Sequence, residues 1–136
     1  MRIAGRALRI ARYVWAAPAT IVGLGFAAFA CFFGATVRFR AGVIEVAGGR
    51  LAGFARSAPQ SIQFLAITFG HVVLGLSHAV LAQEREHEHA HVRQYERWGV
   101  LFFPLYLGSS AAQLIMGRHP YWHNRFERQA FSHARG

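Results

Sequence analysis

The chain has 136 residues, of which 54% are hydrophobic and 15% are charged. This composition excludes a disordered chain and disfavours a freely soluble enzyme, since ordinary soluble domains contain about 25% charged residues. All 15 basic residues are arginine, and the net charge is +9. The arginines are spread along the chain without interleaved aromatic residues, so nucleic acid is not expected as a partner. Membrane lipid fits better, because arginines flank the apolar runs.

The N-terminal region combines a basic segment with a long apolar one. Arginines at positions 2, 6, 9 and 12 are spaced to share one face of a short helix. Residues 13–37 carry no charge, and because a spanning helix needs about 20 residues, they are expected to cross a membrane. A buried or membrane-surface helix is the alternative. We therefore divide the chain into a basic N-terminus with an apolar membrane anchor (1–37) and a metal-binding domain (38–136).

Two segments after the anchor have the character of β-strands. Alternation of polar and apolar residues around Ala41-Gly42 predicts a hairpin over residues 37–46. Residues 50–60 are expected to form a short helix or a loop. Residues 66–75 are β-branched and interrupted by glycine, which predicts either one strand with a bulge or two short strands. A small sheet is therefore expected in the middle of the chain.

Helices are expected in the second half. Ser77 and Gly99 have the residue types that begin and end a helix, and Asn124 is suited to cap a last helix that runs to about residue 134. Residues 99–117 are again free of charge. We expect them to form a core or membrane-surface helix, kinked at Pro104. Together with the strands, these helices predict an α+β fold.

The strongest motif is His87-Glu88-x-x-His91. On a helix, residues four apart share a face, so both imidazoles can reach one metal ion. Zinc lowers the pKa of water that it holds to about 7, and Glu88 beside the ion can take the proton as a catalytic base. At this composition the pattern arises by chance in roughly 2% of chains. The alternatives are a solvated Glu/His helix face and adventitious metal binding by a His-rich tract, and His89 is not expected to be a ligand.

A catalytic zinc site needs a third protein ligand and an open position. The downstream candidates are His119, His123, Glu127 and His133. We prefer Glu127, for which the alternative is a capping-box pair with Asn124. A fourth protein ligand such as His123 would instead indicate a closed structural site.

Further side chains could support such a site. Gln94 continues the face of the two histidines and could orient a ligand. Tyr95 lies on the same face, where ordinary core packing is the alternative. The other residues considered as oxyanion or supporting groups are His71, His119, Tyr121 and His123.

These segments also resemble known proteins. Residues 70–75, 87–99 and 120–127 look like a small, uncharacterised bacterial family of membrane-associated zincin-like metallopeptidases. The layout also resembles the gluzincin domains of membrane-embedded metallopeptidases such as the β-lactam sensors. The resemblance covers residues 62–131. It implies a zincin-like domain with a short antiparallel sheet, and an edge strand within residues 66–74 that holds an extended peptide.

The resemblance also implies roles for individual residues. His87, His91 and Glu127 would bind one zinc ion, and Glu88 would be the base. The expected function is zinc-dependent hydrolysis of a peptide or protein substrate at the bacterial cytoplasmic membrane. The alternative is a non-catalytic membrane scaffold or interaction protein with a structural or vestigial zinc site.

Overall fold

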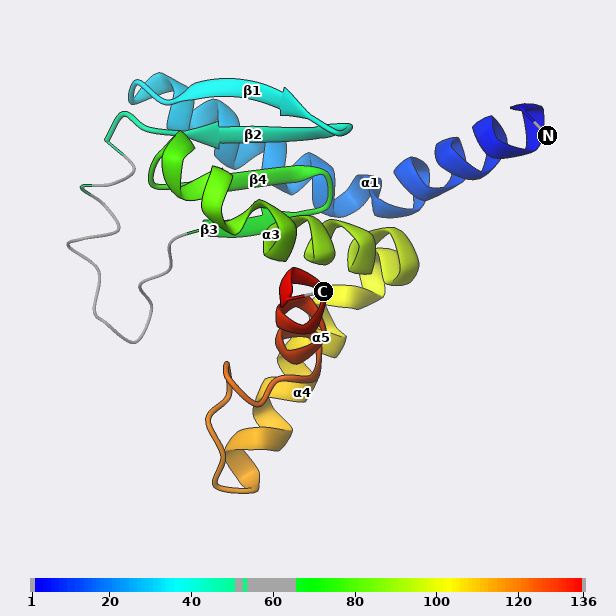
Figure 1. Cartoon of the computed structure of the whole chain (residues 1–136), viewed down its shortest axis with the longest axis vertical. Coiled ribbons are helices and arrows are strands. Elements are labelled where there is room, and N and C mark those ends of the chain that lie inside the picture. Colours follow the sequence, from blue (N-terminus) through cyan, green and yellow to red (C-terminus); the bar gives the residue numbers. More distant parts are fainter. Residues whose placement is uncertain (1, 51–52, 54–65, 136) are drawn as a thin grey trace.

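The computed structural model describes residues 2–50, 53 and 66–135. It has an α+β fold in which a four-stranded sheet lies between two long helices (Figure 1). The elements in chain order are α1 (Arg2–Phe32), β1 (Thr36–Arg40), β2 (Val43–Ala47), β3 (Ala66–Phe69), β4 (Val72–Gly75), α3 (His78–Trp98), the 3₁₀ turn η2 (Gly99–Leu101), α4 (Phe102–Ile115) and α5 (Arg125–Arg135).

The sheet has the strand order β1-β2-β4-β3. Both hairpins are antiparallel, but the central pair β2–β4 is parallel. The expectation of an antiparallel sheet is therefore wrong, and the sheet is mixed. The physical reason is the connection from Ala47 to Val72, which is long enough to return the chain so that β4 runs in the same direction as β2.

Both expected strand segments form hairpins. β1 pairs with β2 through a turn in which Ala41 and Gly42 have positive φ angles of 51° and 79°. Residues 66–75 form two short strands, β3 and β4, that pair around Gly70. The helix or loop expected over residues 50–60 lies outside the described residues, apart from positions 50 and 53.

Alternation along the central strands gives each face of the sheet its own core. Val46 and Val72 pack toward α1, whereas Val43 and Val73 pack toward α3. Because successive side chains point to opposite faces, two short strands supply both cores. The sheet thus lies between α3, which carries the histidine motif, and α1 on its other face (Figure 1).

The basic segment and the apolar segment at the N-terminus form one continuous helix, α1, which ends at Phe32. It packs through small buried residues, Ala16, Gly23, Ala27 and Ala30. A Cβ on Gly23 would lie 2.8 Å from the Val72 Cβ, so the helix backbone directly contacts the sheet. The division expected at residue 37 falls inside β1, and α1 shares one core with the sheet.

The motif helix has the expected ends. The Ser77 Oγ accepts a hydrogen bond from the Val80 amide at 3.1 Å, and Gly99 ends α3 with a φ angle of 58°. The expected kink at Pro104 is wrong, because the change of direction lies in η2 (Figure 1). Pro104 stands in the first turn of α4, where its missing amide hydrogen costs no helical bond.

Two helical segments, Arg2–Phe32 and His78–Ile115, are long and apolar enough to cross a membrane by length and composition. In α4 the polar side chains gather on the face toward α5. The Ser110 Oγ donates to the Pro120 carbonyl at 3.0 Å, and Ser109 Oγ accepts from the Arg125 amide at 3.0 Å. These bonds turn the chain back, so that α5 packs against α3.

Candidate metal centre

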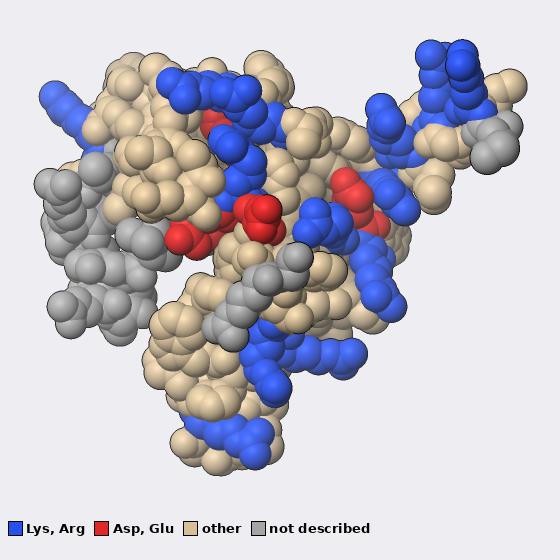
Figure 2. All heavy atoms as spheres, viewed as in Figure 1, with Lys and Arg blue, Asp and Glu red and all other residues tan. Residues whose placement is uncertain are grey.

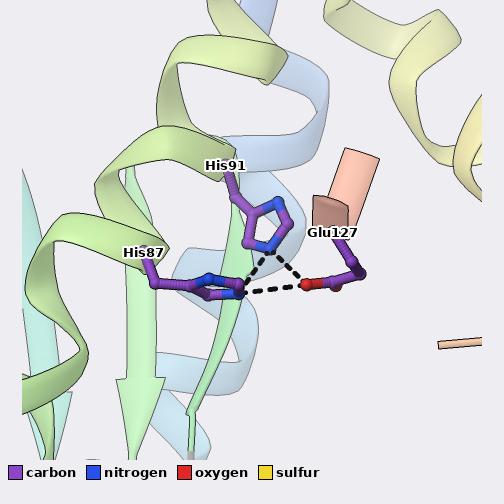
Figure 3. A group of neighbouring side chains, drawn as sticks. All are labelled: His87, His91 and Glu127. Atoms are coloured by element: carbon purple, nitrogen blue, oxygen red, sulfur yellow. Dashed lines mark hydrogen bonds and ion pairs between the residues drawn. The ribbon is translucent and has the colours of Figure 1, made fainter. Parts of the chain in front are cut away.

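Three side chains from two helices converge at one point (Figure 3). His87 and His91 project from one face of α3, and Glu127 comes from the first turn of α5. The Glu127 Oε2 lies 3.0 Å from the His87 Nε2 and 3.2 Å from the His91 Nε2, and the two Nε2 atoms are 3.2 Å apart. All three residues are at most 7% exposed. The preferred ligand set therefore meets in space.

These distances fit one face of a tetrahedral zinc site. With metal–ligand bonds of about 2.0–2.1 Å, the ligand atoms of such a site are about 3.3–3.4 Å apart. The observed triangle needs to widen by only a few tenths of an ångström. Two imidazole nitrogens and a carboxylate oxygen also form a donor set that zinc accepts.

Gln94 fixes which ring nitrogen of His91 carries the hydrogen in the neutral imidazole. Its amide nitrogen donates to the Phe126 carbonyl at 3.0 Å and to the Gln129 Oε1 at 2.8 Å. Its oxygen therefore faces His91 and accepts from the Nδ1 hydrogen at 2.8 Å. In the neutral ring this leaves the lone pair of Nε2 directed at the centre. Gln94 thus orients His91 and also joins α3 to α5.

The centre can hold either a proton or a metal cation. The Nε2 lone pair of His91 faces a second imidazole nitrogen and a carboxylate oxygen, and all three groups are electron donors. Burial lowers the pKa of His91, but the Glu127 carboxylate outweighs this and raises it. A metal ion and protons can therefore compete for the same atoms.

Glu127 is held by several groups. Burial raises the pKa of its carboxyl, but hydrogen bonds from His87 and His91 outweigh this and bring it to about 2. The second oxygen, Oε1, accepts from the Tyr106 hydroxyl at 2.6 Å. Glu127 does not form the alternative capping box with Asn124, because the backbone N–H of Asn124 donates to the Tyr121 carbonyl instead. Asn124 does cap α5, accepting from the Phe126 amide at 2.8 Å.

Glu88 lies beside the centre on the sheet side of α3. It is 6% exposed, and its Oε2 accepts from the Thr68 hydroxyl on β3 at 2.7 Å. Burial raises the pKa of the Glu88 carboxyl, and His91 and the bond from Thr68 oppose the shift. The edge strand β3 therefore positions the Glu88 carboxylate. It lies close enough to His87 and His91 for their charges to act on its pKa.

Several other candidates lie elsewhere. The His71 Nε2 is 2.9 Å from the Glu96 Oε1, and its ring stacks on Tyr13 at 3.8 Å. Tyr95 is 3% exposed and packs against Phe102, as expected for a core residue. The other histidines considered, His119, His123 and His133, are exposed.

Tyr121 is the remaining candidate. Burial raises the pKa of its hydroxyl, and the nearby Glu127 and Glu88 carboxylates raise it further. His119 supports this segment, since its Nδ1 accepts from the Tyr121 amide at 3.2 Å. Tyr121 is thus an oxyanion candidate whose hydroxyl is influenced by both Glu127 and Glu88.

Two residues that hold the acidic side chains of the centre, Thr68 and Tyr106, are not among the candidates predicted from the sequence. Thr68 looks like any strand residue in the sequence, and nothing local pairs it with Glu88. Tyr106 gives a clearer signal. With Ser109, Ser110 and Gln113 it forms a polar stripe at helical spacing on an otherwise apolar segment. Such a stripe indicates a face turned toward a polar partner.

A second buried acidic cluster lies on the opposite side of α3. Glu45 of β2 is 1% exposed and accepts two hydrogen bonds from the Arg85 guanidinium, both at 3.0 Å. The His89 Nε2 is 3.4 Å from the same carboxylate. His89 is thus turned away from the His87–His91 pair, as the sequence predicts.

No protein-family model matches the chain, and neither a curated protein nor a solved structure is significantly similar to it. The resemblance to zincins therefore rests on the segments quoted above, and membership of that family stays a prediction.

Proposed function

We propose that the protein is a zinc-dependent hydrolase that cleaves peptide bonds. The observation that carries this proposal is the convergence of His87 Nε2, His91 Nε2 and Glu127 Oε2 within 3.2 Å, beside a buried glutamate held by Thr68. A nucleophile-generating zinc site needs this combination of three ligands and a base.

The number of ligands favours catalysis over a closed structural site. Among the described residues the group that can hold a metal contains His87, His91 and Glu127 only. His123, the expected fourth ligand of a structural site, is exposed. A three-ligand site keeps a coordination position for water or substrate.

The residues around the centre have distinct roles in this proposal. Zinc supplies a Lewis acid that polarises a carbonyl and acidifies water. Glu88 takes the proton from water during attack and returns it to the leaving amine. Gln94 and Tyr106 hold His91 and Glu127 in orientation, as outer partners of metal ligands commonly do. Tyr121 is the candidate donor to the developing oxyanion.

β3 offers a place for an extended substrate. It lies at one end of the sheet that the described residues form, and Thr68 connects it to Glu88. An extended peptide can pair with such an edge through main-chain hydrogen bonds. A peptide on β3 would pass beside the base, which is the arrangement that peptide-bond cleavage requires.

The proposal includes a membrane location. α1 is long, apolar and flanked by arginine, which supports attachment to a membrane. For a bacterial protein of this kind we assign the cytoplasmic membrane. The rival proposal, a membrane scaffold with a structural or vestigial zinc site, predicts bound metal without turnover.

Metal analysis of the purified full chain tests the site. We expect one zinc per chain in the wild type and loss of that zinc in His87→Ala. The matched control is His89→Ala, which removes a histidine from the same helix but on the Glu45 side. Equal sub-stoichiometric zinc in all three proteins would refute the site.

Peptidase assays on the zinc-loaded protein then separate the two proposals. Cleavage of a mixed peptide library by the wild type, and not by His87→Ala, supports the hydrolase. Stoichiometric zinc with no cleavage of any peptide or membrane-protein substrate would support the scaffold.

A further inference from the structure

α1 has one apolar face along its whole length. At about 100° per residue, five large side chains from both halves of the helix fall in the same sector. They are between 64% and 85% exposed: Ile3, Ile10, Val14, Ile21 and Phe32. This face points away from the sheet, because the residues that pack on the sheet lie in the opposite sector.

The opposite face of α1 changes character halfway along the helix. In the second half it consists of the small buried residues Ala16, Gly23, Ala27 and Ala30. In the first half Arg9 and Arg12 fall in the same sector and Arg2 and Arg6 lie next to it, and all four are exposed. This first half projects beyond the rest of the molecule (Figure 1), and Figure 2 shows basic side chains along it. The projecting half is therefore an amphipathic, basic helix.

The packing of the second half is incompatible with a membrane-spanning helix. Gly23, Ala27 and Ala30 lie against the sheet, and the strands run alongside α1 (Figure 1). If this part of α1 crossed the hydrocarbon, the sheet would enter it as well. β1 is exposed along its length and carries Arg38 and Arg40. Open strand edges do not occur against lipid, and buried arginines there are costly.

We propose that α1 lies in the plane of an anionic membrane surface instead of crossing the bilayer. Its apolar face enters the acyl-chain boundary, its arginines contact headgroup phosphates, and the sheet stands on the aqueous side. Helices with an apolar face and an arginine-rich polar face bind membranes in this way. The net charge of +9 complements the lipid charge. This replaces the spanning anchor expected from the sequence, and it does not depend on the zinc proposal.

Depth measurements distinguish the two orientations. Single cysteines replace Ile10, Ile21 or Phe32 in the full chain on a Cys31→Ser background, and each carries a fluorescent label. The protein is bound to vesicles of phosphatidylcholine and phosphatidylglycerol with nitroxide quenchers at defined acyl positions. An in-plane helix places all three labels at one shallow depth. A spanning helix separates positions 10 and 32 by roughly 33 Å along the normal, which would overturn the proposal.

A charge-reversal pair tests the lipid chemistry. We expect Arg6→Glu/Arg9→Glu to weaken partitioning into phosphatidylglycerol vesicles by about tenfold or more. The matched control, Arg118→Glu/Arg125→Glu, makes the same charge change beyond α4 and should retain binding. Equal loss in both variants would show a non-specific charge effect and would contradict the proposal.

A second copy of the chain is the competing occupant of the apolar face. If cysteines at position 21 cross-link in solution while the labels stay shielded from all lipid quenchers, the face is a protein interface and the proposal is wrong. Quenching by lipid without cross-linking supports the membrane orientation.

Discussion

Two clusters of buried glutamate and histidine lie on opposite sides of α3, and the charge of the carboxylate is balanced differently in each. On one side Glu45 has an arginine partner, so its charge is neutralised within the protein. On the other side Glu127 meets two imidazole nitrogens, whose lone pairs add electron density to the same point. Glu45 is therefore neutralised by an arginine within the protein, whereas the positive charge beside Glu127 must come from a proton on His91 or from a bound metal ion.

The largest effect is expected from replacing Glu88, the proposed base beside the Glu127 cluster. Glu88→Gln should retain zinc, because Glu88 is not a ligand, and should reduce peptide cleavage by about 10²–10⁴-fold. Glu86→Gln, on the exposed side of the same helix, is the control and should keep full activity. Steady-state assays of the zinc-loaded proteins measure the effect. Wild-type rates in Glu88→Gln would remove the residue from the mechanism.

Zinc should stabilise only one of the two clusters. At a free zinc concentration about 100 times the Kd, binding adds about 2.7 kcal/mol to the free energy of unfolding. We expect this gain in wild type and in Glu45→Gln but not in Glu127→Gln. Urea unfolding with zinc or with a chelator measures the difference. A zinc-dependent gain that survives in Glu127→Gln would show that the metal binds elsewhere.

The arginine should be as important to its cluster as zinc is to the other. Arg85→Met leaves the buried Glu45 carboxylate with His89 alone, and we expect a loss of about 1–3 kcal/mol in unfolding free energy. The double variant Glu45→Gln/Arg85→Met should recover part of this loss, since it removes the unpaired charge. Unchanged zinc stoichiometry in both variants would confirm that the clusters are independent.

Acid should weaken the Glu45 cluster through protonation, with the smallest of the expected effects. Burial raises the pKa of the Glu45 carboxyl, but Arg85 and His89 lower it below its ordinary value of 4.5. The stabilisation is therefore present above pH 4.5 and is lost as the pH falls through the lower, folded-state pKa. The stability difference between wild type and Glu45→Gln should shrink over that acid range. A constant difference in urea midpoints across it would contradict the assignment.

The motif helix and its ends could be predicted because their signals are local. Ser77, the His87–His91 spacing and Gly99 each act within a turn or two of α3. Glu127 could also be selected, since a catalytic zinc site needs a third ligand beside the two histidines and the resemblance to gluzincins places a glutamate on a later helix. Its role as a ligand stays a prediction, although the structure brings it to the two histidines.

Other features depend on contacts between distant segments. The parallel β2–β4 pair follows from how the chain crosses over, which no local pattern of residues specifies. Thr68 meets Glu88 only because β3 packs on α3, and the hydroxyl of Tyr106 reaches Glu127 only after α5 folds back. The orientation of α1 likewise depends on which face the sheet covers, and its hydropathy alone suggests a spanning helix.

The clamp that Gln94 forms between α3 and α5 has a consequence for the timing of biosynthesis. The second motif histidine, His91, leaves the ribosome 36 residues before Glu127, which corresponds to roughly 2 to 7 seconds of translation. During this interval the nascent chain presents a two-histidine site with neither its third ligand nor its clamp. Under the proposed function, complete metal coordination and the onset of hydrolysis would therefore follow the docking of α5, so that cleavage is delayed until the chain itself has folded.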